Sequence, residues 1–169
     1  MKNLIIMMVA LVSLSSIGQD LVGIKGVYLG QKVPTDFGSK VDESGTFTWE
    51  YITTLAEVEG MIFVKTNDAG LIYRIYFMPS YREGGLGKAG FHDVNNLVKG
   101  MKKKFGMTAK KKYREGSSTE YSYIEKRGDI VYFIAVTHDV TMVPEYEIAI
   151  SLINIKMEAA VSDETSNDF

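Results

Sequence analysis

The chain contains no cysteine, and only two histidines and three prolines occur in its 169 residues. Without cysteine it cannot form a disulfide, a thiolate metal site or a thiol nucleophile. The two histidines, His92 and His138, are each followed by aspartate, but neither belongs to an H-E-x-x-H or H-x-H pattern. Because a zinc site takes three or four ligands, usually at close spacing, the sequence predicts no metal site.

The chain also lacks a large excess of charge of either sign, because it has 19 basic and 21 acidic residues and a net charge of -2. So weak an overall field favours neither nucleic acid nor an anionic membrane surface as a partner. No run of residues after residue 18 approaches the about 20 apolar residues that a membrane-spanning helix needs. We therefore expect no nucleic-acid partner and no membrane span.

The N-terminus has the layout of a secretory signal. Lys2 supplies a positive start, an apolar run covers residues 4–12, and the small residues Ser16 and Gly18 follow. This pattern predicts a signal peptide over residues 1–18, cleaved before Gln19, and a periplasmic or secreted protein. The alternatives are a buried helix and a membrane anchor, for which the apolar run is short.

Residues 19–157 have the length of a single domain, and a chain of this size buries enough surface to fold without disulfides. Alternation of apolar and polar residues predicts seven strands. They cover residues 21–29, 45–52, 58–66, 71–78, 119–126, 130–137 and 145–155. Turn residues at 67–70 and 127–129 favour antiparallel hairpins. Residues 158–169 are acidic and rich in Ser, Thr and Asn, and we expect a disordered acidic tail.

One amphipathic helix is predicted between the two sets of strands, over residues 90–105. Lysines gather in its last turns, and Gly106 follows as a stop signal. The apolar residues that recur with a 3.6-residue period are Phe91, Val94, Leu97, Val98, Met101 and Phe105. We expect an α+β fold, with an antiparallel sheet of about six or seven strands and this helix packed on one face.

Short motifs resemble those of a known group of proteins. Residues 26–30 read G-V-Y-L-G, paired hairpins follow, and the helix ends in Phe105-Gly106. These features are similar to those of small exported α+β domains of Bacteroidetes-type bacteria, which open with G-x-x-L-G and end their helix in Lys-Tyr-Gly. Here Phe105 replaces the tyrosine, and Pro34 interrupts the helix that often follows the opening. The resemblance covers residues 24–155 and implies the fold but no particular activity.

Residues 85–90 read G-L-G-K-A-G and match the G-x-G-x-x-G pattern of dinucleotide-binding loops. In that fold the loop directly follows a strand, whereas residues 79–84 intervene here. Lys110, Lys111 and Lys112 also stand where an acidic residue is expected. We predict a plain loop and no cofactor. The N-terminus of the helix predicted to follow it could nevertheless hold an anion.

Catalytic signatures are equally sparse, because neither G-x-S-x-G nor S-x-x-K occurs. Glu57 with Glu59, and Glu145 with Glu147, lie two residues apart on predicted strands, so each pair shares one face. A glycosidase needs its two carboxylates across a cleft, and these pairs are more typical of a solvated sheet surface. His138 closes the most apolar strand. We predict that the protein is not an enzyme.

Aromatic and basic residues are the remaining candidates for binding. Two predicted strands carry aromatic residues among polar neighbours, which is typical both of interfaces and of ordinary sheets. Residues 99–114 hold eight positive charges and could contact a polyanion, or could form a solvated helix end. The candidate binding residues are Trp49, Tyr51, Tyr121, Tyr123, Lys102, Lys103, Lys110 and Lys111.

Three hypotheses for function follow. The first is a non-catalytic envelope domain that binds another protein, as inhibitors and immunity proteins do, through an exposed aromatic sheet face. The second is a small-molecule or lipid carrier, which requires an apolar pocket of a few hundred cubic ångströms between helix and sheet. The third and least favoured is a hydrolase, with His138 in a cleft and carboxylates within hydrogen-bond reach.

Overall fold

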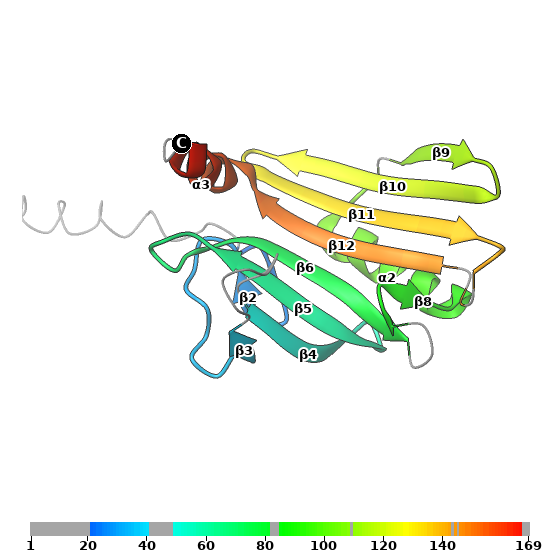
Figure 1. Cartoon of the computed structure of the whole chain (residues 1–169), viewed down its shortest axis with the longest axis horizontal. Coiled ribbons are helices and arrows are strands. Elements are labelled where there is room, and N and C mark those ends of the chain that lie inside the picture. The colour runs from blue at the N-terminus through cyan, green and yellow to red at the C-terminus, as the bar shows by residue number, and fades with distance from the viewer. Residues whose placement is uncertain are drawn as a thin grey trace, which may run out of the picture.

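The computed structural model describes residues 21–40, 49–81, 85–108, 110–142, 144 and 146–166 (Figure 1). The predicted signal peptide at residues 1–18 lies outside them. The fold is α+β with a mostly antiparallel sheet, as predicted. The prediction was wrong in its counts, because the described residues form a main sheet of ten strands and two helices. Neither of these helices is long and apolar enough to cross a membrane.

The main sheet joins two sets of strands from the two halves of the chain. Its strands run in the order β3-β4-β5-β6-β12-β11-β10-β9, and the two sets meet where β6 pairs with β12. The first set comprises β3 (Ser39–Lys40), β4 (Trp49–Leu55), β5 (Val58–Thr66) and β6 (Ile72–Tyr81). The second comprises β9 (Lys111–Glu115), β10 (Ser118–Arg127), β11 (Ile130–Asp139) and β12 (Tyr146–Asn154). The predicted hairpins at 67–70 and 127–129 are confirmed.

The segment predicted as one strand at residues 21–29 is instead a small hairpin of its own. It consists of β1 (Gly23–Ile24) and β2 (Val27–Tyr28), which pair with each other. Lys25 and Gly26 between them have positive φ angles of 51° and 82°. Two such residues in succession make a tight hairpin turn, so the run of strand-forming residues is broken in its middle.

The G-L-G-K-A-G segment fills a gap in the main sheet and is not the plain loop that we predicted. Its two short strands, β7 (Gly85–Leu86) and β8 (Lys88–Ala89), pair with β6 and β12 respectively. Between them the Gly87 N–H donates to the Pro79 carbonyl at 2.8 Å, and the Gly87 carbonyl accepts from the Ile148 N–H at 2.7 Å. The glycines therefore serve the backbone geometry of the sheet.

The helix α2 (Phe91–Phe105) forms where the apolar period predicts it and ends at Gly106, which has a φ of 59°. Figure 1 shows α2 behind the sheet, where it covers one face. It contacts β5, β11 and β12. The helix residues buried against this face are Val94, Leu97, Met101 and Phe105, and the sheet residues buried there include Ile62, Phe77, Ile134, Val136, Ile148 and Ile150.

The tail that we predicted to be disordered is helical as far as Ser166, in α3 (Ile155–Ser166), and the last three residues lie outside the described chain. The side-chain oxygen of Asn154 accepts the Met157 N–H at 3.1 Å, which is a helix-capping bond. Glu158 forms an ion pair with Arg74 of β6. The prediction of disorder rested on the polar, acidic composition of residues 158–169. It did not take account of the helix-forming residues that begin at Ile155 or of the capping residue before them.

Gly87 provides a test of the structural role of the glycine motif. Its φ of +82° lies in a region that costs residues with a Cβ about 1–2 kcal/mol, although no atom would contact the added methyl group within 4 Å. We therefore expect Gly87→Ala to lower the free energy of unfolding by about 1–2 kcal/mol in urea denaturation.

Gly90→Ala is the matched control, because Gly90 has an ordinary φ of -77°. Its added Cβ would meet only the Asp93 carboxylate, at 3.8 Å. Alanine caps the helix less well than glycine, which lowers the free energy of unfolding, but it also makes the unfolded chain less flexible, which raises it. We therefore expect the free energy of unfolding to change by less than about 0.5 kcal/mol. Equal losses at Gly87 and Gly90 would contradict the structural role assigned to Gly87.

Candidate functional site

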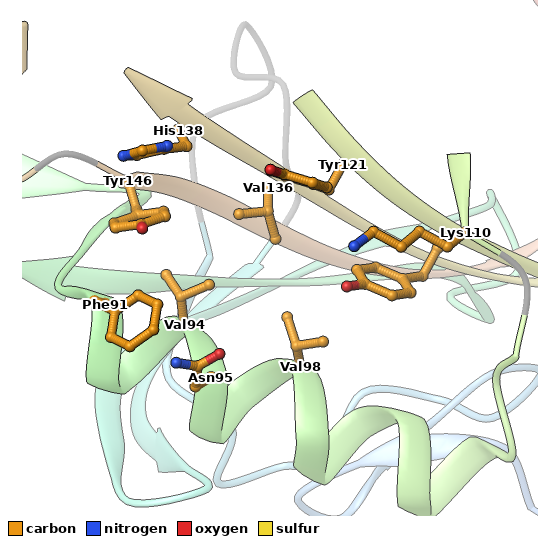
Figure 2. Close-up of a pocket in the computed structure, with 10 residues that line it drawn as sticks. Phe91, Val94, Asn95, Val98, Lys110, Tyr121, Val136, His138 and Tyr146 are labelled. Atoms are coloured by element: carbon orange, nitrogen blue, oxygen red, sulfur yellow. The ribbon is translucent and has the colours of Figure 1, made fainter. Parts of the chain in front are cut away.

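A pocket of about 280 Å³ lies between α2 and the second set of strands (Figure 2). Helix side chains form one wall, strand side chains form the other, and a lysine from the segment before β9 stands at the rim. The lining residues are Phe91, Val94, Asn95 and Val98 of α2, Tyr121 and Tyr123 of β10, Val136 and His138 of β11, Tyr146 of β12, and Lys110.

The helix wall of the pocket lies beside the face of α2 that is buried in the core. Its members are three or four residues apart, so their side chains lie on the same side of the helix. Phe91 is 64% exposed and Val98 is half-buried, whereas Leu97 and Met101 are buried. Phe91 and Val98, which share the predicted apolar stripe, therefore line the pocket instead of filling the core.

The strand wall follows from the pairing of three neighbouring strands. Tyr121 of β10 lies opposite Val136 of β11, and His138 of β11 lies opposite Tyr146 of β12. Directly paired residues of antiparallel strands point to the same face of the sheet. All four side chains therefore lie on the α2 side, and Figure 2 shows them across the pocket from the helix.

Aromatic rings gather at one end of the pocket. The Tyr146 and His138 rings stack, with centroids 4.5 Å apart and planes inclined by 14°. The Phe91 ring lies 5.9 Å from the Tyr146 ring. These separations are typical of favourable ring contacts, so this end presents a preformed apolar wall to a ligand.

The other end of the pocket is basic. The Lys110 ammonium lies 4.4 Å from the centroid of the Tyr121 ring and 5.8 Å from that of Tyr123. Lys102 of α2 lies 5.0 Å from the Tyr123 ring, and Lys112 of β9 lies 5.6 Å from the Tyr121 ring. Three ammonium groups from separate segments thus meet over two tyrosine rings, each within cation–π range of about 6 Å.

The candidate binding residues predicted from the sequence are only partly brought together. Tyr121, Tyr123 and Lys110 line the pocket, and Lys102 lies over the Tyr123 ring. Lys103 is exposed on α2 outside the pocket lining, and Lys111 is exposed on β9. Because side chains alternate along a strand, Lys111 points to the opposite face of the sheet from its neighbour Lys112.

Trp49 and Tyr51 lie far from this pocket, on β4. Four strands of the sheet separate β4 from β10. Trp49 packs against the core, and the ring of Tyr51, which is 39% exposed, lies 5.2 Å from the Phe37 ring at a tilt of 35°. The four predicted aromatic residues therefore do not form a single surface.

In neither predicted carboxylate pair does the structure describe both members on one strand. Glu57 lies in the turn between β4 and β5 with a φ of 68°, and only Glu59 is on a strand. Glu147 forms an ion pair with Lys88, and Glu145 lies outside the described residues. Within the described chain no group of three or more histidine, aspartate or glutamate side chains is arranged to hold a metal.

His138 lines the pocket, and the aspartate that follows it is held elsewhere. Asp139 accepts hydrogen bonds from the Thr141 hydroxyl at 2.6 Å and the Thr141 N–H at 2.9 Å. The Ser117 hydroxyl lies 3.3 Å from the same carboxylate. Because neighbouring residues of a strand alternate, the Asp139 carboxylate lies on the face of β11 opposite the pocket.

Sequence reasoning did not identify Phe91, Val98, Tyr146 or Lys112 as binding residues. Comparison with known proteins adds no further assignment, because no family model, curated protein or solved structure matches the chain. The resemblance to exported Bacteroidetes-type domains therefore stays a prediction.

The Asp139 cluster generates a test of the turn beside the pocket. The hydroxyl hydrogen bond from Thr141, the Thr141 N–H and the Ser117 hydroxyl together hold the pKa of Asp139 below its ordinary value of 3.8. We expect Thr141→Val to raise this pKa toward 3.8, as measured by NMR titration of the carboxyl carbon. Ser117→Ala, which removes a longer hydrogen bond, should raise it less.

The same shift sets a direction for stability. Because the folded-state pKa of Asp139 lies below its unfolded value, the carboxylate contributes stability above the unfolded pKa, and this contribution is lost as pH falls through the folded pKa. The thermal midpoints of the wild type and Thr141→Val should therefore differ at neutral pH and converge in acid. A difference that grows as pH falls would contradict this account.

Proposed function

We propose that the protein is a non-catalytic, exported binding domain of the cell envelope that holds a small apolar or aromatic molecule between α2 and strands β10–β12. The observation that carries this proposal is the pocket, which has a volume of about 280 Å³ and a lining made mostly of aromatic and valine side chains. Ligand sites typically measure about 300–1,000 Å³. The pocket therefore suits a compact ligand, or one part of a longer ligand.

A carrier requires its pocket between the helix and the sheet, and this pocket has that position. A protein-binding face would instead require exposed apolar residues in one continuous surface. The exposed Ile52 lies on β4 and the exposed Tyr113 on β9, at opposite ends of the sheet. The geometry therefore favours a small ligand over the protein partner, which stays a hypothesis.

Export is the part of the proposal that rests on the sequence of residues 1–18 alone. The non-catalytic role rests on the sequence, which contains neither G-x-S-x-G nor S-x-x-K. In the pocket wall the His138 ring stacks on the Tyr146 ring. We assign His138 the role of an aromatic wall.

Phenylnaphthylamine, an uncharged fluorescent molecule with two aromatic groups, tests this proposal directly. We expect the mature domain to bind it with a saturable increase in fluorescence. Val98→Trp places a large side chain in the pocket, where it occupies volume that the probe would otherwise fill. The affinity for the probe should therefore fall by about tenfold or more.

Lys103→Trp is the matched control, because it adds the same side chain to an exposed position of the same helix. Its affinity for phenylnaphthylamine should stay within about twofold of the wild type. Circular dichroism checks that both variants are folded. The proposal is wrong if the wild type does not bind the probe, or if the folded Val98→Trp variant binds it as tightly as the wild type.

A further inference from the structure

We infer that the ligand of this pocket is an amphipathic anion, whose acid group is held by Lys102, Lys110 and Lys112 while its apolar body lies against α2 and Tyr146. The inference rests on the proposed function and names the chemical class of the ligand. It follows from the arrangement of charge around the pocket.

The three lysines converge although they come from different segments. Lys102 lies in the last turns of α2, Lys110 precedes β9, and Lys112 is on β9. The pairing of Lys112 with Tyr121 places the Lys112 side chain on the pocket side of the sheet. Lys110 and Lys112 share the Tyr121 ring, and Lys110 and Lys102 share the Tyr123 ring. The three ammonium groups therefore surround the same two tyrosine rings.

The described chain provides no carboxylate partner for these lysines. Its ion pairs are Arg74–Glu158, Lys88–Glu147 and Arg127–Glu125, so no described carboxylate lies within 4.0 Å of the three ammonium groups. Glu125 shares the pocket face of β10 but pairs with Arg127 at 3.7 Å. Glu120 alternates with Tyr121 and points to the other face. Grouped like charges repel one another, and a bound anion would relieve this repulsion.

The cation–π contacts leave the lysines able to bind an acid group. An ammonium group has three N–H donors, and the face of a ring does not use them as a carboxylate does. At exposed sites such contacts are weaker than hydrogen bonds to charged groups. The hydroxyls of Tyr121 and Tyr123 are additional donors. An acid group therefore gains stronger contacts here without displacing an ion pair.

The far end of the pocket fits the apolar part of such a ligand. Phe91, Val94, Val98 and Tyr146 line it without charge, and the His138 ring is stacked on Tyr146 there. One end of the pocket is thus basic and the other is apolar, which matches a molecule that joins one acid group to an alkyl chain or an aromatic ring system. A polyanion would engage the whole segment 99–114, whereas Lys110 lines the pocket and Lys102 and Lys112 lie over the Tyr123 and Tyr121 rings in its wall.

Two related probes separate this inference from the proposed function. Anilinonaphthalene sulfonate has the ring system of phenylnaphthylamine and an added sulfonate, which stands in for the acid group. We expect the wild type to bind the sulfonate about tenfold more tightly than the neutral probe, because charged hydrogen bonds add about 1.5 kcal/mol or more. The double variant Lys110→Gln and Lys112→Gln should lose this preference, so that its affinities for the two probes differ by less than about twofold.

The matched control removes two charges from the same segment but outside the pocket, by Lys103→Gln and Lys111→Gln. Its affinity for both probes should equal that of the wild type. If the two double variants weaken sulfonate binding equally, or if the wild type binds the sulfonate no more tightly than the neutral probe, the inference is overturned and the proposed function stands. If neither probe binds the wild type, both are overturned.

Displacement of the sulfonate probe then identifies the body of the ligand. Decanoate represents alkyl acids and naphthoate represents aromatic acids, and decanol and naphthol are their uncharged counterparts. Displacement by either acid at concentrations about tenfold lower than by its counterpart supports the inference and indicates the type of body. Equal displacement by acid and alcohol in both pairs overturns it.

Discussion

The packing of α2 across both sets of strands is the contact on which the rest of the structure depends. The helix touches β5 from the first set and β11 and β12 from the second, and Leu97 is completely buried at this contact. The sets are also joined by four residue pairs between β6 and β12, by β7 and β8, which pair with β6 and β12 respectively, and by α3, whose Glu158 forms an ion pair with Arg74 of β6. With no disulfide available, this shared core holds the two sets in one sheet.

The position of α2 also creates the pocket. Residues that turn directly toward the sheet, such as Leu97 and Met101, fill the core, whereas Phe91 and Val98 lie to one side of them and remain accessible. The strands β10 and β9 continue the sheet beyond β11, where Tyr121 is half-buried and Lys112 is exposed. The proposed site is thus the incompletely covered margin of the helix–sheet interface.

Much of the fold was predictable because its longer elements follow simple periods. β5 and α2 begin and end within one residue of their predicted limits, because alternation and the 3.6-residue period extend over whole elements there. The short elements were not predictable in this way, since β7 and β8 depend on hydrogen bonds from Gly87 to strands distant in the sequence. For the site, alternation identified Tyr121 and Tyr123. Whether Val98 fills the core or lines the pocket depends on how the helix lies on the sheet, and a local sequence pattern does not contain this information.

All the residues that line the pocket fall between Phe91 and Tyr146, and several of them, including Asn95 and Lys110, are exposed. Substitutions at exposed positions usually change stability by less than about 0.5 kcal/mol, while those in the core cost several times more. The exposed positions of the proposed site are therefore distinct from buried core positions such as Leu97 and Met101. Under the proposed function, a few side chains on one helix and three strands can therefore change the ligand preference while the underlying scaffold stays the same.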